Sequence, residues 1–310
     1  MPGQTLDPEQ IAISATALPY LHLPPKRLFS LRAERLRHLA TDHPLGDYLR
    51  LIASLCDTQQ GLLDQPPENV ALDMHRINQC AAHKLPPLAA DTLVREDGWL
   101  VFLDALLERV TPEPAQGPVA DALDTLRKAP VDERRAWAVM LLAGQYTGVP
   151  AALVPFLSAA LQAAFSHWLL QLPEGTVKDI GSHAQCPCCG SPAMAGVIRH
   201  QGKYNGLRFL VCSLCACEWH LVRVKCIHCD SSEGLKYYTF ENDKYAPDRA
   251  PIRAEACPNC TSYLKLVYLE SDANAEALSA DLASLALDMR MDEEGFQRQT
   301  PNLMLAPGDG

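Results

Sequence analysis

Four cysteine pairs with the spacing Cys-x-x-Cys lie within 75 residues of this 310-residue sequence, and they constrain its fold more than any other feature. Two thiolates three residues apart on a tight turn can bind one metal ion, and two such turns complete a tetrahedral shell of four sulfurs. Pairing the turns in order along the chain predicts two metal sites. The first takes Cys186, Cys189, Cys212 and Cys215, and the second takes Cys226, Cys229, Cys257 and Cys260.

Each predicted site would close a small module. Cys186 begins the first site and Cys226 begins the second, so the two modules are offset by only 40 residues. Apolar burial alone would not hold such a module together, and a structural metal site would stabilise it by about 10–16 kcal/mol. Gly190, after the Cys-Pro-Cys-Cys turn of the first pair, tolerates the positive φ that rubredoxin-type turns favour. Short β-branched and aromatic runs favour hairpins around the pairs; they are Ala195–Ile198, Leu207–Val211, Trp219–Val224, Lys236–Phe240 and Tyr263–Leu269.

Other interpretations of the cysteines fit less well. A thioredoxin-like redox site uses a single pair within an α/β pattern. A catalytic zinc site keeps an open coordination position, and two closed shells of four thiolates leave none. Metal that serves only as a structural staple stays open as an interpretation. Cys188 and Cys217 lie beside ligands and could replace one, and His183, His220 and His228 raise mixed-ligand alternatives.

The spacing does not decide the metal. Tetrahedral shells of four sulfurs suit both iron and zinc. Zinc is the ordinary occupant of ribbon modules in cytosolic proteins.

The rest of the chain predicts helices. Up to about residue 180, apolar residues recur at spacings of three and four, and proline pairs such as Pro66–Pro67 and Pro86–Pro87 separate the stripes. Cys56 and Cys80 fall on or beside these stripes, so we expect inert, buried thiols. After Glu270 the periodicity returns and predicts one terminal helix over 275–289, followed by a poorly ordered tail rich in Pro and Gly.

The predicted fold class is therefore α+β. An all-α domain spans residues 1–180. Two tandem rubredoxin-like or zinc-ribbon-like modules follow at 181–225 and 226–270, and a C-terminal helix and tail occupy 271–310.

Charge and hydropathy narrow the functional classes. The formal net charge of −10 argues against a general nucleic-acid binder, because neutralising phosphates needs a basic face. No uninterrupted apolar run reaches the roughly 18 residues of a membrane span. The opening residues, MPGQTLDPEQ, do not resemble a secretory signal, so we expect a cytoplasmic protein.

A zinc-ribbon adaptor for nucleic acids is the alternative function. Residues 186–270 carry ten Lys/Arg and eight Asp/Glu, a net charge of only +2. Five basic side chains could line one face of the ribbons: Arg199, Lys203, Arg208, Arg223 and Lys225. A thiol oxidoreductase, the third option, would need an exposed cysteine of low pKa.

Two segments resemble a known family. The run CSLCACEWHLVRVKCIHC, over 212–229, is similar to the signature of the formate dehydrogenase accessory protein family (FdhE). The run ADLASLALD, over 280–288, together with Glu294-Gly-Phe and Pro301-Asn, resembles the C-terminal end of that family. The helical half agrees in character but carries no sharp motif.

The resemblance implies a cytoplasmic maturation factor and not an enzyme. Family members bind the catalytic subunit of formate dehydrogenase before its export by the twin-arginine route, and they hold iron in rubredoxin-like sites. Carried over to this chain, the iron ligands of two mononuclear sites are the eight paired cysteines, with zinc as the alternative metal. Cys188 and Cys217 lie outside the family pattern. We also expect the helical half to contribute to contact with the client.

Overall fold

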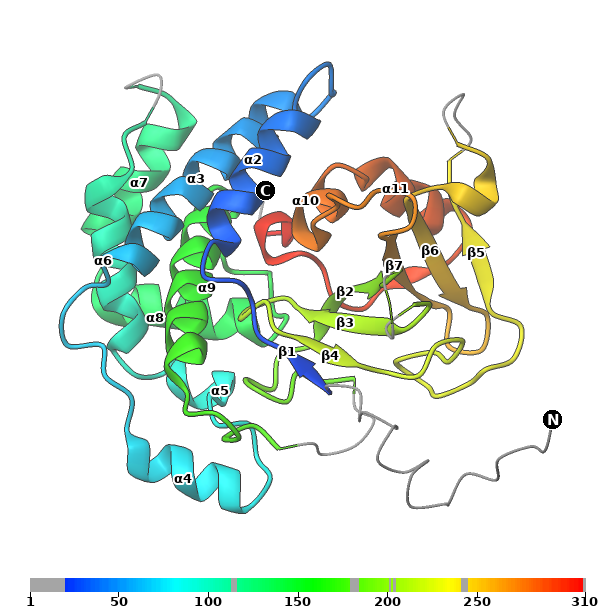
Figure 1. The fold of residues 1–310 in the computed structure, drawn as a ribbon. Helices are drawn as coiled ribbons and strands as arrows, with labels where there is room; N and C mark the ends of the chain where they lie inside the picture. The colour runs from blue at the N-terminus through cyan, green and yellow to red at the C-terminus, as the bar shows by residue number, and fades with distance from the viewer. Residues whose placement is uncertain are drawn as a thin grey trace.

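The computed structural model describes residues 20–112, 116–178, 184–200, 202, 205–240 and 245–308. A helical region lies to one side of a mixed β-sheet that carries the paired cysteines, as Figure 1 shows. The predicted α+β class, a helical region followed by a cysteine-rich sheet region, is confirmed.

The helices follow the apolar stripes and begin where the sequence offers a boundary. Asp73 caps α4 by accepting from the backbone N–H groups of His75 and Arg76. Gly117 and Pro118 open α7 in the arrangement that favours a helix start. The helices of this region are α2 (Leu28–Leu39), α3 (Gly46–Asp64), α4 (Met74–Ala82), α5 (Ala90–Leu93), α6 (Gly98–Arg109), α7 (Pro118–Lys128), α8 (Val131–Leu142) and α9 (Val154–Gln171), with a 3₁₀ turn at Ala151–Leu153 before α9.

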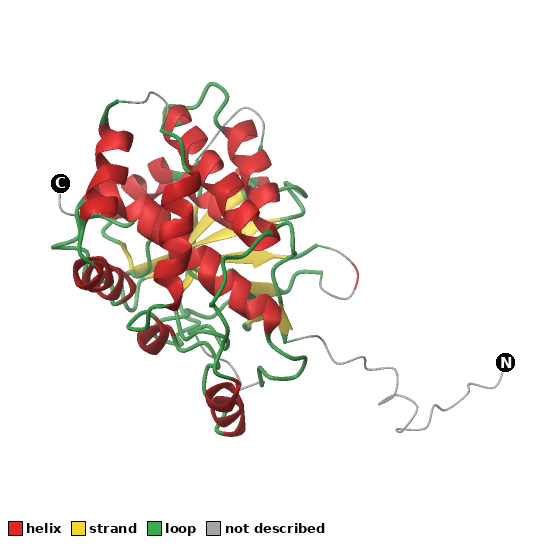
Figure 2. Cartoon of the chain, turned by 90° about the vertical axis from the view of Figure 1, so that its left-hand side faces the viewer, coloured by secondary structure: helices red, strands yellow, loops and turns green. Residues whose placement is uncertain are grey.

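Helix α9 is the centre of the helical region. Figure 2 shows the helices packed in front of the sheet. The segment Ala151–Gln171 is long and apolar enough to cross a membrane, which the sequence analysis did not anticipate, but 94% of its most apolar window is buried within the protein. Its apolar length therefore serves the core, in which α9 packs against α3 and α6.

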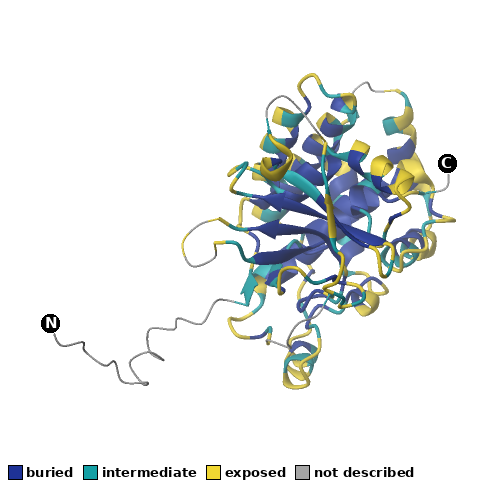
Figure 3. Ribbon diagram, turned by 90° about the vertical axis from the view of Figure 1, so that its right-hand side faces the viewer, coloured by how far each residue is buried: buried dark blue, intermediate teal, exposed yellow. Residues whose placement is uncertain are grey.

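The sheet has the strand order β1-β4-β3-β2-β7-β6-β5, with β8 beside β7. The predicted strands are present, although β4 ends earlier than the run Trp219–Val224 suggested, and β1, β6 and β8 were not predicted. In Figure 3 the central strands form a largely buried layer. The bounds are β1 (Leu21–His22), β2 (Ala193–Ile198), β3 (Arg208–Cys212), β4 (Glu218–His220), β5 (Lys236–Tyr238), β6 (Ile252–Cys257), β7 (Ser262–Tyr268) and β8 (Gln297–Arg298).

A parallel pair, β2 beside β7, joins the strands of the two predicted ribbons into one sheet. Gly196 faces Leu266 across this pair, and a Cβ at Gly196 would lie only 2.7 Å from the Cδ2 atom of Leu266. Glycine therefore permits the close approach of the two strands. The module boundaries at 180, 225 and 270 stay predictions.

The C-terminal segment departs from the expected single helix and loose tail. It forms two short helices, α10 (Ala277–Leu282) and α11 (Leu285–Glu293), separated at Ala283 and Ser284. The tail up to residue 308 is packed, because Leu303 and Met304 are buried and the Ser158 hydroxyl donates to the carbonyl of Leu303 at 2.8 Å. The expectation of poor order is therefore wrong for this part of the tail.

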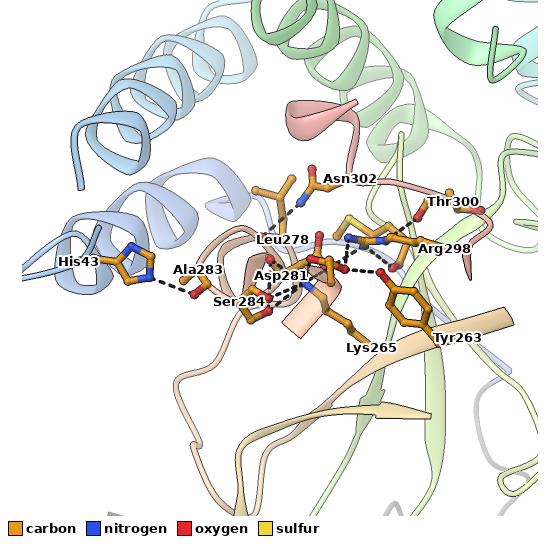
Figure 4. A network of polar contacts seen from close by, with 12 residues as sticks. His43, Tyr263, Lys265, Leu278, Asp281, Ala283, Ser284, Arg298, Thr300 and Asn302 are labelled. Atoms are coloured by element: carbon orange, nitrogen blue, oxygen red, sulfur yellow. Dashed lines mark hydrogen bonds and ion pairs between the residues drawn. The ribbon is translucent and has the colours of Figure 1, made fainter. Parts of the chain in front are cut away.

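A buried polar network fixes these C-terminal helices on the sheet (Figure 4). Lys265 on β7 is 1% exposed and forms ion pairs with Asp281 at 3.2 Å and Asp288 at 2.5 Å. Arg298 on β8 reaches Asp281 at 2.7 Å and Asp288 at 3.3 Å. The acidic residues of the run at 280–288 thus have a structural role in this fold.

Candidate metal centres

The first cysteine cluster brings together Cys186, Cys189, Cys212 and Cys215. All four sulfurs lie within 4.8 Å of one another, which is a group that could hold a metal ion. The Sγ atoms of Cys186 and Cys215 are 3.6 Å apart, and those of Cys189 and Cys212 are 3.4 Å apart. Each of the four residues is at most 1% exposed. Two turns of the chain therefore face each other as the spacing predicted.

The second cluster repeats this arrangement with Cys226, Cys229, Cys257 and Cys260. The contact between Cys226 and Cys260 and the contact between Cys229 and Cys257 are both 3.6 Å between Sγ atoms. In both clusters the first cysteine of each pair thus contacts the second cysteine of the other pair. Cys229 and Cys260 are half-buried, so the second cluster lies nearer the surface than the first.

The donor set of each cluster fits a soft tetrahedral ion, because four thiolates suit zinc and iron. Backbone N–H groups point at the sulfurs: Cys188 donates to the Sγ of Cys186 at 3.4 Å, and His228 donates to the Sγ of Cys226 at 3.4 Å. Such hydrogen bonds stabilise the negative charge of a thiolate ligand. The geometry does not distinguish the two metals.

All four turns share one backbone feature that the sequence analysis anticipated at Gly190 alone. The residue directly after the second cysteine of each pair has a positive φ. A left-handed residue there lets the chain turn back around the sulfurs. These residues are Gly190 with φ 77°, Ala216 with 58°, Asp230 with 62° and Thr261 with 51°.

The helical region covers the first cluster directly. The backbone N–H of Leu88 donates to the carbonyl of Cys188 at 2.9 Å, and that of Ala90 donates to the carbonyl of Cys189 at 2.9 Å. A Cβ at Gly190 would meet the ring of Pro86 at 3.7 Å. The segment 86–90 therefore holds the first turn in place by backbone pairing.

Polar side chains at the second cluster modify its thiols, and the spacing of the pairs did not reveal them. The Asn259 amide donates to Cys229 at 3.4 Å, which lowers the pKa of that thiol to about 6. Burial instead raises the pKa of Cys226 to about 12. Ser262 lies 2.9 Å from the sulfur of Cys260. Ser262 stands two residues after Cys260, the last cysteine of its pair, and this place in the sequence is the only feature that could have pointed to it.

Cys188 and Cys217 do not lie apart from the first cluster. With Cys186 they form a third group of sulfurs within 4.8 Å of one another. The Sγ atoms of Cys186 and Cys217 are 3.2 Å apart, and both Cys188 and Cys217 are fully buried.

Histidine does not join these groups in the part of the chain that the structure describes, where the candidate metal groups contain cysteine alone. His220 packs against the ring of Phe209 at 5.6 Å. His228 follows Cys226 on the exposed side of the turn. His183 lies outside the described residues.

The two cysteines of the helical region differ. Cys56 on α3 is fully buried, and burial raises its pKa to about 12, as expected of an inert thiol. Cys80 on α4 is only half-buried and lines a cleft, so the expectation of burial is wrong there. Within helix α4 only Ile77 is buried.

The basic side chains considered for nucleic acid do not form one surface. Arg208 is fully buried and pairs with buried Glu255 at 2.7 Å. Arg199 pairs with Glu218, and Lys225 pairs with Asp230 at 2.9 Å. Arg223 is exposed, and Lys203 lies outside the described residues. A shared basic face is therefore not supported among the residues that the structure places.

A cleft of about 970 Å³ runs between the helical region and both clusters. Asp91 and Arg95 line its helical wall, and the opposite wall includes Gly190 of the first cluster and His228 of the second. One cysteine turn from each cluster and the helical region thus border the same cleft.

The chain matches three family models in succession: "FdhE, N-terminal" over residues 17–182, "FdhE, central domain" over 185–223 and "FdhE, C-terminal domain" over 224–305. It is 61% identical to the Protein FdhE homolog of Pseudomonas putida over 305 residues, covering 98% of this chain and 96% of that protein. It is 56% identical to the Protein FdhE homolog of Pseudomonas aeruginosa over 303 residues, 98% of each chain.

A solved structure agrees with the fold. The crystal structure of the FdhE protein from Pseudomonas aeruginosa superposes with a TM-score of 0.89 at 55% sequence identity, covering 94% of this chain and 100% of that one. Matches in sequence and in structure thus extend over the helical region, both cysteine clusters and the C-terminal segment. The chain therefore belongs to the FdhE family, whose members are formate dehydrogenase accessory proteins.

Proposed function

We propose that this protein is a cytoplasmic maturation factor that binds the catalytic subunit of formate dehydrogenase and is needed for the activity of that enzyme. The observation that carries the proposal is the combination of FdhE family membership with two preformed four-cysteine clusters. The chain acts on its client by binding and carries out no catalytic reaction of its own.

The eight paired cysteines hold one iron ion in each of the two clusters in this proposal. Iron bound by four thiolates can exchange one electron without a change of ligands. The buried first cluster shapes the surface around it, while half-buried Cys229 and Cys260 bring the second ion near solvent. The second site is therefore the better placed of the two to respond to the client or to a reductant.

The metal assignment has a direct optical test. Ferric thiolate absorbs visible light and zinc thiolate does not. We expect the protein purified without added metal to be coloured and to contain iron. A colourless protein containing zinc contradicts the iron assignment and leaves the ligand assignment intact.

The cleft supports a contribution of the helical region to client binding. Its walls combine Asp91 and Arg95 with the turns of both clusters, so a client segment in the cleft would contact both parts of the chain. Reversing the charge with Arg95→Glu changes the helical wall without touching a thiol. We expect weaker client binding at unchanged metal content. Arg27→Glu, at a side chain 71% exposed and outside the lining, is the matched control.

Complementation tests the function. In bacterial cells that make formate dehydrogenase but lack their own FdhE gene, we expect this chain to restore formate-dependent dye reduction. The double variants Cys186→Ser/Cys189→Ser and Cys226→Ser/Cys229→Ser are expected to fail, whereas the control Arg27→Glu, outside the cleft, is expected to succeed. If both double variants lose metal and still restore full activity, the clusters are not the working part of the protein.

A further inference from the structure

We propose that the first cluster contains a second metal position, formed by Cys188 and Cys217 together with Cys186, whose sulfur is shared with the first position. Two ions would then be bridged by the Cys186 thiolate. The proposal rests on the arrangement of the six sulfurs and does not depend on the identity of the client.

The three sulfurs of the second position lie together in the structure. The Sγ atoms of Cys186, Cys188 and Cys217 all lie within 4.8 Å of one another, and those of Cys186 and Cys217 are 3.2 Å apart. A tetrahedral shell with metal–sulfur bonds of about 2.3 Å has sulfur–sulfur edges of about 3.8 Å. These three thiols are thus close to the spacing that a second ion requires.

Charge and burial favour the same arrangement. All six cysteines of this cluster are at most 1% exposed. One divalent ion with four thiolates carries a net charge of −2, and two divalent ions with six thiolates also carry −2. Adding Cys188, Cys217 and a second ion therefore introduces no further uncompensated charge into the core.

The second cluster provides an internal comparison. Counted from the cysteine pairs, His228 occupies the place of Cys188, and Ser262 occupies the place of Cys217. Ser262 lies 3.9 Å from the sulfur of Cys226, as Cys217 lies 3.2 Å from that of Cys186, and it is 2.9 Å from the sulfur of Cys260. His228 is exposed, whereas Cys188 is buried. Soft ligands occupy both places only in the first cluster, which limits the proposal to that cluster.

Ser262 also defines the competing role. A hydroxyl there can only donate a hydrogen bond to the ligand sulfurs, and Cys217 could do the same through its S–H group. A hydrogen-bonding role leaves one ion in the first cluster. A bridging role places two ions there.

Titration of the metal-free full chain with Co²⁺ alone, without oxygen, separates the two roles. We expect three tightly bound ions per chain, and two for the Cys188→Ser/Cys217→Ser variant. The control variant Ser262→Ala, at the matching place of the second cluster, keeps three. Saturation of the unaltered protein at two ions overturns the proposal, and so does an unchanged count in the double variant.

The magnetic state of the cobalt gives an independent readout. The Cys226→Ser/Cys229→Ser variant lacks the second cluster, so it should bind two ions that share the Cys186 sulfur. A shared thiolate couples the two Co²⁺ spins, and we expect an electron paramagnetic resonance intensity well below that of two isolated ions. Adding Cys188→Ser/Cys217→Ser should leave one ion with full intensity. One bound ion with full intensity before this addition contradicts the second position.

Discussion

Thr261 has a left-handed backbone conformation, with φ 51°, directly after the last cysteine of the second cluster. A β-branched residue in this conformation costs about 1–2 kcal/mol relative to the right-handed one. We expect Thr261→Gly to raise the free energy of unfolding of the metal-loaded protein by about 1 kcal/mol, because glycine adopts this φ without steric cost. Denaturant titration followed by circular dichroism measures the change.

Gly190 provides the reverse substitution at the equivalent place of the first cluster, where φ is 77°. We expect Gly190→Ala to lower the free energy of unfolding by at least about 1 kcal/mol. The shared left-handed position does not explain the stability of the turns if Thr261→Gly destabilises the protein while Gly190→Ala has no effect.

Asp281 is fully buried between two cations, Lys265 and Arg298. Burial alone would raise the pKa of Asp281, but the charges of Arg298 and Lys265 outweigh it and hold the pKa below its usual range. A carboxylate with a lowered pKa stabilises the fold above its unfolded pKa of about 4, and that stabilisation is lost as the pH falls through the lower folded value.

Replacing Asp281 by Asn tests this contribution. We expect the variant to lose about 3–5 kcal/mol of unfolding free energy at pH 7, since two buried cations lose a charged partner. The difference from the unaltered protein should shrink below about pH 4, where Asp281 of the unfolded chain becomes protonated, and disappear as the pH falls through the lower folded pKa. A difference that stays constant down to pH 3 would mean that the carboxylate charge is not the stabilising feature.

At the scale of elements, the sequence predicted those features that depend on residues close together in the chain. The cysteine spacing carried enough information to place both clusters, because the geometry of a two-thiolate turn is local. The apolar stripes likewise predicted the helical region. Strand β6 was missed since its residues, IRAEAC, mix Arg253 and Glu255 with alanines and show no strong β pattern. Their side chains find partners only in the folded sheet.

The terminal helix shows the same limit. The apolar repeat continues across Ala283 and Ser284, yet the chain breaks there into α10 and α11. The Lys265 ammonium donates to the carbonyls of Asp281 at 3.0 Å and Ser284 at 3.1 Å, which are groups that a continuous helix would have used itself. A contact from a distant strand therefore ends α10, and periodicity alone does not reveal it.

Arg208 connects the elements around the second cluster. From β3 it pairs with Glu255 on β6 and donates to the carbonyls of Val222 at 2.5 Å and Lys225 at 2.8 Å, directly before the Cys226 turn. We expect Arg208→Met to cost about 3–5 kcal/mol, because it leaves the buried carboxylate of Glu255 without a cationic partner. It should also speed the loss of metal from the second cluster to a chelator.

Two further variants define the cause of that effect. Adding Glu255→Gln to Arg208→Met should recover part of the lost stability, since the unpaired charge is removed. Arg223→Met, at an exposed position, should leave both stability and metal release unchanged. Unaltered metal release in Arg208→Met would show that the Cys226 turn does not depend on this link.

At the scale of the whole molecule, the helical region and the sheet share one core. Residues of α9, of β3 and of the first cluster belong to a single buried apolar cluster. Arg32 on α2 pairs with Glu276 before α10 at 3.0 Å, which ties the beginning of the helical region to the C-terminal segment. These long-range contacts, like the parallel pairing of β2 with β7, have no local sequence signal.

The shared core predicts that the two clusters stabilise the molecule unequally. Loss of metal at the first cluster opens a site inside the common core, while loss at the second affects a site nearer the surface. We expect Cys186→Ser/Cys189→Ser to lower the Tm of the helical circular dichroism signal by at least about 5 °C more than Cys226→Ser/Cys229→Ser does. Equal Tm values would show that the first cluster is not part of the common core in energetic terms.

Direct binding to the client tests the central claim most closely. The measurement is the Kd between the metal-loaded full chain and the purified catalytic subunit of formate dehydrogenase, with Cys226→Ser/Cys229→Ser and the control Arg27→Glu, outside the cleft, measured in parallel. We predict saturable binding that the cluster variant weakens by at least about tenfold, or about 1.4 kcal/mol, and that Arg27→Glu leaves unchanged. Absence of binding by the unaltered protein, or equal affinity for all three, would contradict a maturation factor that acts through its metal clusters.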